Sequence, residues 1–232
     1  AITMALIFVV LFFLEKLWRT RVMVIVGVGL VVGGALLFGF TEKLPYSVQR
    51  TLSFLPVKVD PFVKTSAQNS SDWRLEMWKE AWEKEVPKYL FKGKGYTFTA
   101  DDLFMSNYAI QTGRARNWET ALVAGDYHNG PLSLLIPFGI YGLLAFLWLV
   151  IAGWHFLYVA YRDSLPELRR INALLFACFV GRAIFFLVVY GAAAHDLFYL
   201  TGILGLSVAL NVRARAKTEA QPAVDLEPSP QI

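Results

Sequence analysis

The chain has 232 residues, 56% of them hydrophobic, and a formal net charge of +4. This composition excludes an ordinary soluble domain and indicates a membrane protein with several spans. The single cysteine, Cys178, excludes an internal disulfide, and its apolar surroundings favour a packing role. The chain opens inside an apolar run without a methionine, so we expect it to be the C-terminal part of a longer protein.

Two apolar stretches come first. Residues 2–14 are followed by a basic segment, the reverse of the order in a signal peptide, and we expect a truncated transmembrane helix there. Residues 22–40 can cross roughly 28 Å as a helix, close to the thickness of the hydrocarbon core. Gly29 and Gly33 in this span are typical of close helix packing, but equally of the general abundance of glycine in membrane helices.

A polar loop of both charge signs follows, over residues 41–130. Its first third contains three prolines and predicts at most short helices. Apolar residues at spacings of three and four then predict a helix from Ser71 that Pro87 ends. We expect a glycine turn at residues 93–95 and a second helix over 100–111.

The remainder of the loop carries fewer signals. We expect residues 113–127 to be irregular and Asp102, beside a second aspartate, to be solvated rather than a metal ligand. A loop of this length in a compact protein usually has a function.

Three more spans are predicted, at residues 132–158, 171–190 and 197–212, with Pro137 kinking the first. An outer turn should occupy residues 191–196. The fold class is therefore an all-α polytopic transmembrane bundle of about five spans with a large external helical loop. The predicted organisation is two helices over 1–40, the loop over 41–130, three helices over 131–212, and a disordered tail over 213–232.

The short connections set the orientation. Basic residues are concentrated in three of them, at 16–21, 162–170 and 213–217, and the positive-inside rule makes that side cytoplasmic. The loop 41–130 should then lie outside the membrane, which means in the periplasm if the cell is a Gram-negative bacterium. We found no internal repeat typical of inverted-repeat transporters.

Arg74 and His128 are the strongest candidates for chemistry. An arginine on a loop helix is usually a solvated charge, but Trp73, Trp78 and Trp82 give this helix an aromatic side. A guanidinium held there can grip a diphosphate with two hydrogen bonds.

His128 is either an interfacial polar residue or a group that takes a proton from an acceptor hydroxyl or helps a diphosphate to leave. Its neighbours Asn129 and Asp126 could orient it.

Arg182 lies near the middle of a predicted span, where a charge costs about 2.5–3.5 kcal/mol on insertion scales. It should face a cavity, an anionic ligand or a structural partner, and we expect no acid at its depth. Asp196 could pair with His195 or join the same outer site. His155, at the other end of a span, favours a structural role.

The pattern His128-Asn129, nine residues, Gly139, two residues, Gly142 resembles that of the O-antigen ligase and polymerase-like family of bacterial membrane glycosyltransferases. The segment from Trp73 through Trp78 to the glycine turn is similar to the loop helix of that family. The resemblance covers roughly residues 20–210.

The resemblance implies a fold like that of GT-C glycosyltransferases. It implies transfer of a glycan from a polyprenyl diphosphate donor to a lipid A core sugar, a growing polysaccharide or a protein, without a metal or other cofactor. Arg74 and His128 match the essential loop residues of the family, and Arg182, Asn129, Asp196 and Trp78 become candidates for substrate binding. We expect contact with membrane lipids and no nucleic-acid partner.

Two other functions remain open. A transporter accounts for the spans and for Arg182, but it leaves the long loop without a role. A non-catalytic envelope assembly protein accounts for the loop, but it does not require a titratable histidine.

Overall fold

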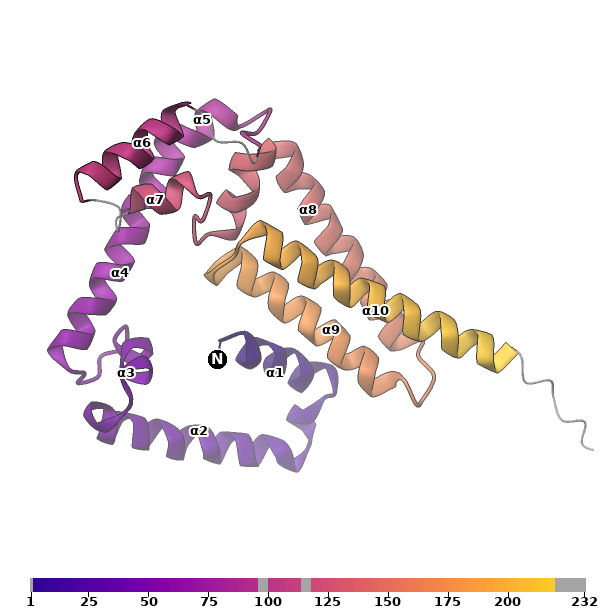
Figure 1. The fold of residues 1–232 in the computed structure, drawn as a ribbon. Helices are drawn as coiled ribbons and strands as arrows, with labels where there is room; N and C mark the ends of the chain where they lie inside the picture. Colours follow the sequence, from indigo (N-terminus) through magenta and orange to yellow (C-terminus); the bar gives the residue numbers. More distant parts are fainter. Residues whose placement is uncertain (1, 96–99, 114–117, 220–232) are drawn as a thin grey trace, which may run out of the picture.

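The computed structural model describes residues 2–95, 100–113 and 118–219, and these residues form helices and no strand (Figure 1). The apolar runs form α1 (Ile2–Leu14), α2 (Arg21–Phe40), α8 (Gly130–Arg162), α9 (Arg169–Ile184) and α10 (Ala193–Glu219), and a π-helical segment, η4 (Phe185–Val189), prolongs α9. The loop contains α3 (Tyr46–Leu52), α4 (Pro61–Glu80), the π-helical η3 (Ala81–Glu85), α5 (Val86–Tyr89), α6 (Ala100–Gln111) and α7 (Trp118–Val123).

Within the described residues, four helices are long and apolar enough to cross a membrane, and α1 is a shorter apolar helix. The four are Arg21–Lys43, Gly130–Arg162, Arg169–Val189 and Ala193–Val212. The predicted fold class, a polytopic helical membrane bundle, is confirmed. No residue of α2 is buried, and Gly29 and Gly33 have no neighbour within 4 Å, so no described segment packs against this glycine pair.

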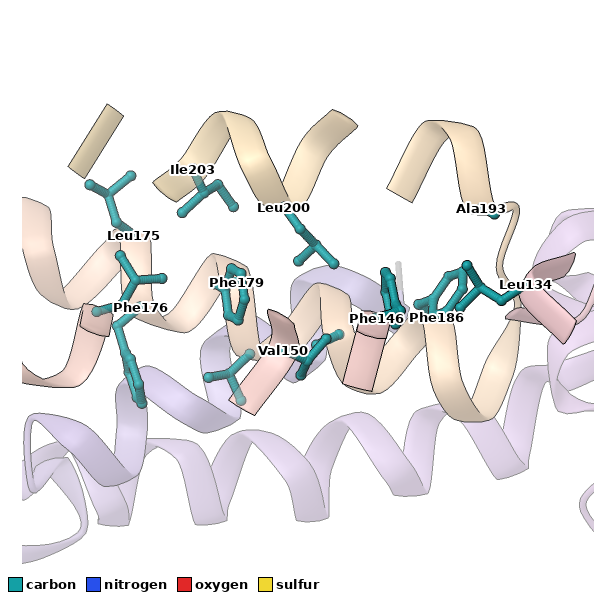
Figure 2. Packing of buried hydrophobic residues seen from close by; sticks show 13 residues of the cluster. Leu134, Phe146, Val150, Leu175, Phe176, Phe179, Phe186, Ala193, Leu200 and Ile203 are labelled. Carbon is teal, nitrogen blue, oxygen red and sulfur yellow. The ribbon is translucent and has the colours of Figure 1, made fainter. Parts of the chain in front are cut away.

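The core lies where α8, α9 and α10 pack together, with α1 against α9 (Figures 1 and 2). Aromatic rings fill the space between α8 and η4, where Phe146 and Phe186 have centroids 4.7 Å apart. Helix α1 crosses α9 closely at Gly181, where a Cβ atom would lie 2.9 Å from Cγ1 of Ile7. At the opposite end of the bundle, Asn172 and Asn211 exchange hydrogen bonds of 2.9 and 3.0 Å between α9 and α10. These contacts hold α8, α9 and α10 together as one bundle.

The first long loop helix starts earlier than predicted. Helix α4 begins at Pro61 rather than at Ser71, because Asp60 caps it by accepting a hydrogen bond from the Phe62 N–H at 2.7 Å. An aspartate followed by proline at the first helical position is a strong start signal. The helix therefore gains length toward the membrane span α2 (Figure 1).

The predicted end of this helix at Pro87 is also wrong. Pro87 occupies the first turn of α5, where a missing N–H costs little, and the wider turn of η3 precedes it. The helix predicted over 100–111 is confirmed as α6. Helix α7 forms within the segment predicted to be irregular, and residues 114–117 of that segment lie outside the described residues.

Helix α8 is interrupted beside Pro137, as predicted, but the non-helical residue is Gly139, with φ of 68° and ψ of −171°. The glycine turn of the loop docks into this break. The N–H groups of Lys94 and Gly95 donate to the carbonyls of Ile136 and Pro137 at 2.7 and 2.9 Å. In return, the Ile140 N–H donates to Leu90 O at 2.6 Å. The loop and the span thus share backbone hydrogen bonds.

The side chain of Lys94 strengthens this junction. Its Nζ lies 2.6 Å from Oδ1 of Asp102 on α6 and 3.9 Å from Oε2 of Glu85. Asp102 is 8% exposed, so the prediction that it is solvated is wrong. The ion pair joins α6 to the same turn that enters the break in α8.

The outer turn between α9 and α10 is shorter than predicted. Helix α10 starts at Ala193, so His195 and Asp196 belong to its first turn. At the other end, α10 continues to Glu219, past the predicted start of the disordered tail, and residues 220–232 lie outside the described residues. The shorter turn moves Asp196 to the depth of Arg182.

Candidate functional site

His128 lies in the turn between α7 and α8, at the end of the bundle where α8 begins. Its φ of 50° is in the left-handed region, which a residue other than glycine adopts at a cost of about 1–2 kcal/mol. The next residue, Asn129, caps α8, because its Oδ1 accepts a hydrogen bond from the Leu132 N–H at 3.0 Å. Strained backbone of this kind is found preferentially at functional sites, where the surrounding structure holds it in place.

The residue before the histidine anchors this turn to the loop. Tyr127 is 2% exposed, and its carbonyl accepts a hydrogen bond from Nε1 of Trp78 at 2.7 Å. Burial raises the pKa of the Tyr127 hydroxyl, and the nearby Glu85 and Asp102 raise it further. Trp78, which we predicted to bind substrate, thus also holds α4 against the turn that carries His128.

One nitrogen of the His128 ring is directed at Asp126. Nδ1 lies 3.5 Å from Asp126 Oδ1, and both atoms are shielded from solvent without a hydrogen-bond partner among the described residues. The ring also contacts Trp73 and Tyr190, with centroids 5.4 and 5.2 Å away. Asp126 therefore faces Nδ1 of His128, as the sequence suggested.

Arg74 follows Trp73 on α4 and is half-buried. Its guanidinium makes no ion pair or hydrogen bond with any residue that the structure describes. Its positive charge lowers the pKa of the Tyr190 hydroxyl, so Arg74 and the histidine turn face the same region. Its neighbour Trp73 contacts the His128 ring, so the two residues that the sequence singled out lie on elements that touch. A shared catalytic role for Arg74 and His128 stays a prediction.

Arg182 has a partner that we did not predict. Its Nε lies 2.5 Å from Oδ1 of Asp196, which is fully buried and accepts a second hydrogen bond from the Ala192 N–H at 3.0 Å. The expectation that no acid lies at the depth of Arg182 is wrong, because the shorter outer turn brings Asp196 inward. His195 is exposed and does not take part in this pair.

An apolar groove of about 520 Å³ opens beside the site, between the loop helices and the first half of α8. One side of the groove is lined by Leu75, Trp78 and Lys79 of α4 and by Trp82 of η3. Residues of the turn and of α8 line the other side: Asn129, Pro131, Leu132, Leu135 and Leu143. The groove therefore runs from a neighbour of His128 to a helix that is apolar enough to span the membrane.

Tyr190 is the site residue that we missed. A tyrosine at the outer end of a predicted span is typical of the aromatic belt at a membrane surface, and the sequence offers no further signal. In the structure the ring of Tyr190 contacts His128, in the turn before α8. Its hydroxyl also feels the charges of Arg74, on α4, and Arg182, on α9.

His155 is exposed on α8, next to Trp154 and Tyr158 along a shallow depression. It lies on the apolar stretch beyond Val150 and is not part of the site around His128.

Comparison with known proteins gives one match. A protein-family model described as O-antigen ligase matches residues 1–147, which is more than half of the chain and includes Arg74 and His128. No curated protein and no solved structure matched the chain. The match extends over α1, α2, the whole loop and the first half of α8, including Gly139, at which α8 is interrupted. The chain belongs to the O-antigen ligase family.

Proposed function

We propose that this protein transfers a glycan from a polyprenyl diphosphate donor to an acceptor hydroxyl at the outer face of the cytoplasmic membrane. Membership of the O-antigen ligase family gives a ligase or polymerase type of role in envelope glycan assembly. The observation that carries the finer proposal is the pairing of an unpartnered guanidinium, Arg74, with a strained histidine, His128, at one end of a membrane bundle.

His128 is the general base in this proposal. The acceptor oxygen attacks the anomeric carbon of the donor sugar while the bond from that carbon to the diphosphate oxygen breaks. The electron pair of the broken bond leaves with the diphosphate, and the proton of the acceptor hydroxyl passes to Nε2 of His128. Asp126 supports this role, because its carboxylate faces Nδ1 at 3.5 Å and would tighten onto the imidazolium as it forms.

Arg74 binds the diphosphate. Negative charge grows on the leaving oxygens as the sugar departs, and a planar guanidinium stabilises it with two parallel hydrogen bonds. No described acid neutralises Arg74, so its full charge is available to a ligand.

The apolar groove supports a lipid-linked donor. Its lining is almost entirely aromatic and aliphatic, and it leads from Asn129 toward Leu143 on a membrane-spanning helix. An isoprenoid chain lying in it would keep its diphosphate end beside His128 and its far end in the bilayer.

The charge distribution supports an external site. The site lies on the side of the bundle opposite to the basic segment at 162–170, which the positive-inside rule assigns to the cytoplasm. A reporter fused after Lys92 should therefore be external, and one fused after Arg215 should be cytoplasmic.

A reconstituted reaction tests the proposal. The full chain, in lipid nanodiscs, should transfer glycan from a defined undecaprenyl diphosphate donor to an acceptor hydroxyl and release undecaprenyl diphosphate. The same rate with and without a chelator is expected, because the proposed chemistry uses only Arg74, His128 and Asp126. An absolute requirement for a divalent metal, or the absence of transfer with every acceptor class of the envelope, would contradict it.

A further inference from the structure

Tyr190 is directed into the site by an irregular helix end. The π-helical segment η4 closes with a hydrogen bond of 3.0 Å from the Tyr190 N–H to the Phe185 carbonyl, five residues back. The backbone of Tyr190 is then extended, with φ of −166° and ψ of 134°. Such π-turns are frequent at functional sites, because the extra residue re-aims a side chain. Here the re-aimed side chain reaches His128 rather than the lipid around α9.

The ring of Tyr190 has aromatic partners, but its hydroxyl has none. The ring lies 5.2 Å from that of His128 and 6.4 Å from that of Phe185. The side chain is half-buried, and its hydroxyl makes no hydrogen bond with any residue in the described part of the chain. A half-buried phenol usually finds a partner. The free hydroxyl is thus available to a bound molecule.

The charges around this hydroxyl come from four parts of the fold: α4, the turn between α7 and α8, α9 and α10. Burial raises the pKa of Tyr190 and Asp126 adds to the rise, while Arg74 lowers it; Asp196 and Arg182, which are paired with each other, act weakly in opposite directions. The net shift is upward, so the phenol keeps its proton well above neutral pH and acts as a donor. Arg74 is the cation among these groups that has no partner in the described part of the chain, and its charge acts on the hydroxyl while the Tyr190 ring contacts His128.

We propose that the Tyr190 hydroxyl donates a hydrogen bond to a phosphate oxygen of the lipid-linked substrate, on the opposite side of that phosphate from Arg74. This inference rests on the proposed function and adds the residue that follows η4 to a site otherwise built from the loop. Tyr190 is a substrate-contacting residue in this view, rather than a tyrosine that only anchors the helix in the membrane surface.

Tyr190→Phe tests the role of the hydroxyl, because it keeps the ring contacts with His128. We expect kcat/KM for the polyprenyl diphosphate donor to fall about tenfold or more, as for the loss of a hydrogen bond to a charged group. Binding of farnesyl diphosphate to the protein in nanodiscs should weaken by a similar factor. The temperature of unfolding should stay the same, because the hydroxyl has no partner in the protein. The matched control is Tyr141→Phe, on an exposed part of α8, which should leave both values unchanged.

The possible results separate the two levels of inference. Donor binding and kcat/KM equal to the wild type in Tyr190→Phe would overturn the role of the hydroxyl and leave the proposed function standing. Weakened association with vesicles rich in phosphatidylglycerol, without any change in farnesyl diphosphate binding, would also overturn it, since the phenol would then contact a bulk lipid headgroup. A wild-type protein that neither transfers glycan nor binds farnesyl diphosphate would overturn both.

Discussion

Arg182 and Asp196 form an ion pair that ties α9 to the first turn of α10, with Nε and Oδ1 2.5 Å apart. The second carboxylate oxygen accepts the Ala192 N–H, and the guanidinium lies over the rings of Phe185 and Tyr199 at 5.3 and 5.6 Å. Each charge is therefore compensated locally. The pair holds together the two helix ends that flank Tyr190.

Arg182→Leu should destabilise the protein by about 3–5 kcal/mol, because it leaves the fully buried carboxylate of Asp196 without its counter-charge. The double variant Arg182→Leu/Asp196→Leu should recover most of this loss, since no uncompensated charge remains. Thermal unfolding in detergent micelles measures both. A double variant no more stable than Arg182→Leu would contradict the pairing.

The double variant also separates structure from substrate binding. If it is stable and transfers glycan at the wild-type rate, the role of Arg182 is structural, and the prediction that Arg182 and Asp196 bind substrate fails. A stable but inactive double variant would support direct binding.

Arg74→Lys should lower kcat/KM by about tenfold or more while the protein folds normally. Lysine keeps the positive charge but cannot form two parallel hydrogen bonds to a phosphate. Arg50→Lys, on the loop helix α3, is the matched control and should retain full activity. Transfer in nanodiscs with the donor at subsaturating concentration is the measurement. Full activity of Arg74→Lys would mean that Arg74 acts only as a point charge or not at all.

His128→Gln should be nearly inactive at every pH, because glutamine can donate a hydrogen bond but cannot accept the proton of the acceptor. Wild-type activity should be lost at acidic pH, since only a neutral imidazole can act as a base. Asp126→Asn should lower kcat more than KM, because the carboxylate facing Nδ1 supports the imidazolium as it forms. Substantial, pH-independent activity of His128→Gln would rule out the base and favour a hydrogen bond from His128 to the diphosphate.

Gly139→Ala should destabilise the protein by at least about 1–2 kcal/mol, because residue 139 has a positive φ. The added Cβ would also lie 2.7 Å from the carbonyl oxygen of Phe91 and 2.9 Å from that of Leu90, and the Leu90 oxygen accepts the Ile140 N–H that docks the loop. Gly202→Ala, in a helical part of α10 with open space around it, is the control and should be neutral or slightly stabilising. The measurement is the unfolding temperature of each variant. Equal unfolding temperatures for Gly139→Ala and Gly202→Ala would contradict the close approach of the loop at Gly139.

The spans could be predicted because long apolar runs between charged segments leave few alternatives. Helix α6 was also predicted, over the same residues that the structure shows. The start of α4 was misplaced because Asp60 and Pro61 were interpreted as loop residues, although together they form a capping signal. The local sequence pattern was therefore sufficient to predict the spans and α6, and it was misinterpreted at the start of α4.

The parts that could not be predicted depend on contacts between distant segments. Asp196 was placed outside the bundle, because the length of the turn before α10 is set by tertiary packing: Gly191 fits against the Cα of Gly130. Arg74 and His128 were identified by their sequence context, but nothing in that context indicated that Tyr190 would meet them. A tyrosine at a membrane surface has the same local sequence whether it faces lipid or a site.

The hydrogen bonds between the glycine turn and the break in α8 constrain how loops can be exchanged between relatives. A chimaera that joins the loop of one protein to the spans of another after residue 130 would separate Lys94 and Gly95 from the carbonyls that they satisfy. Both sides would then bury unpaired backbone groups. The smallest transferable unit therefore runs from α4 through Ile140, and acceptor specificity, if it is determined by the loop, should pass between relatives only with that unit intact.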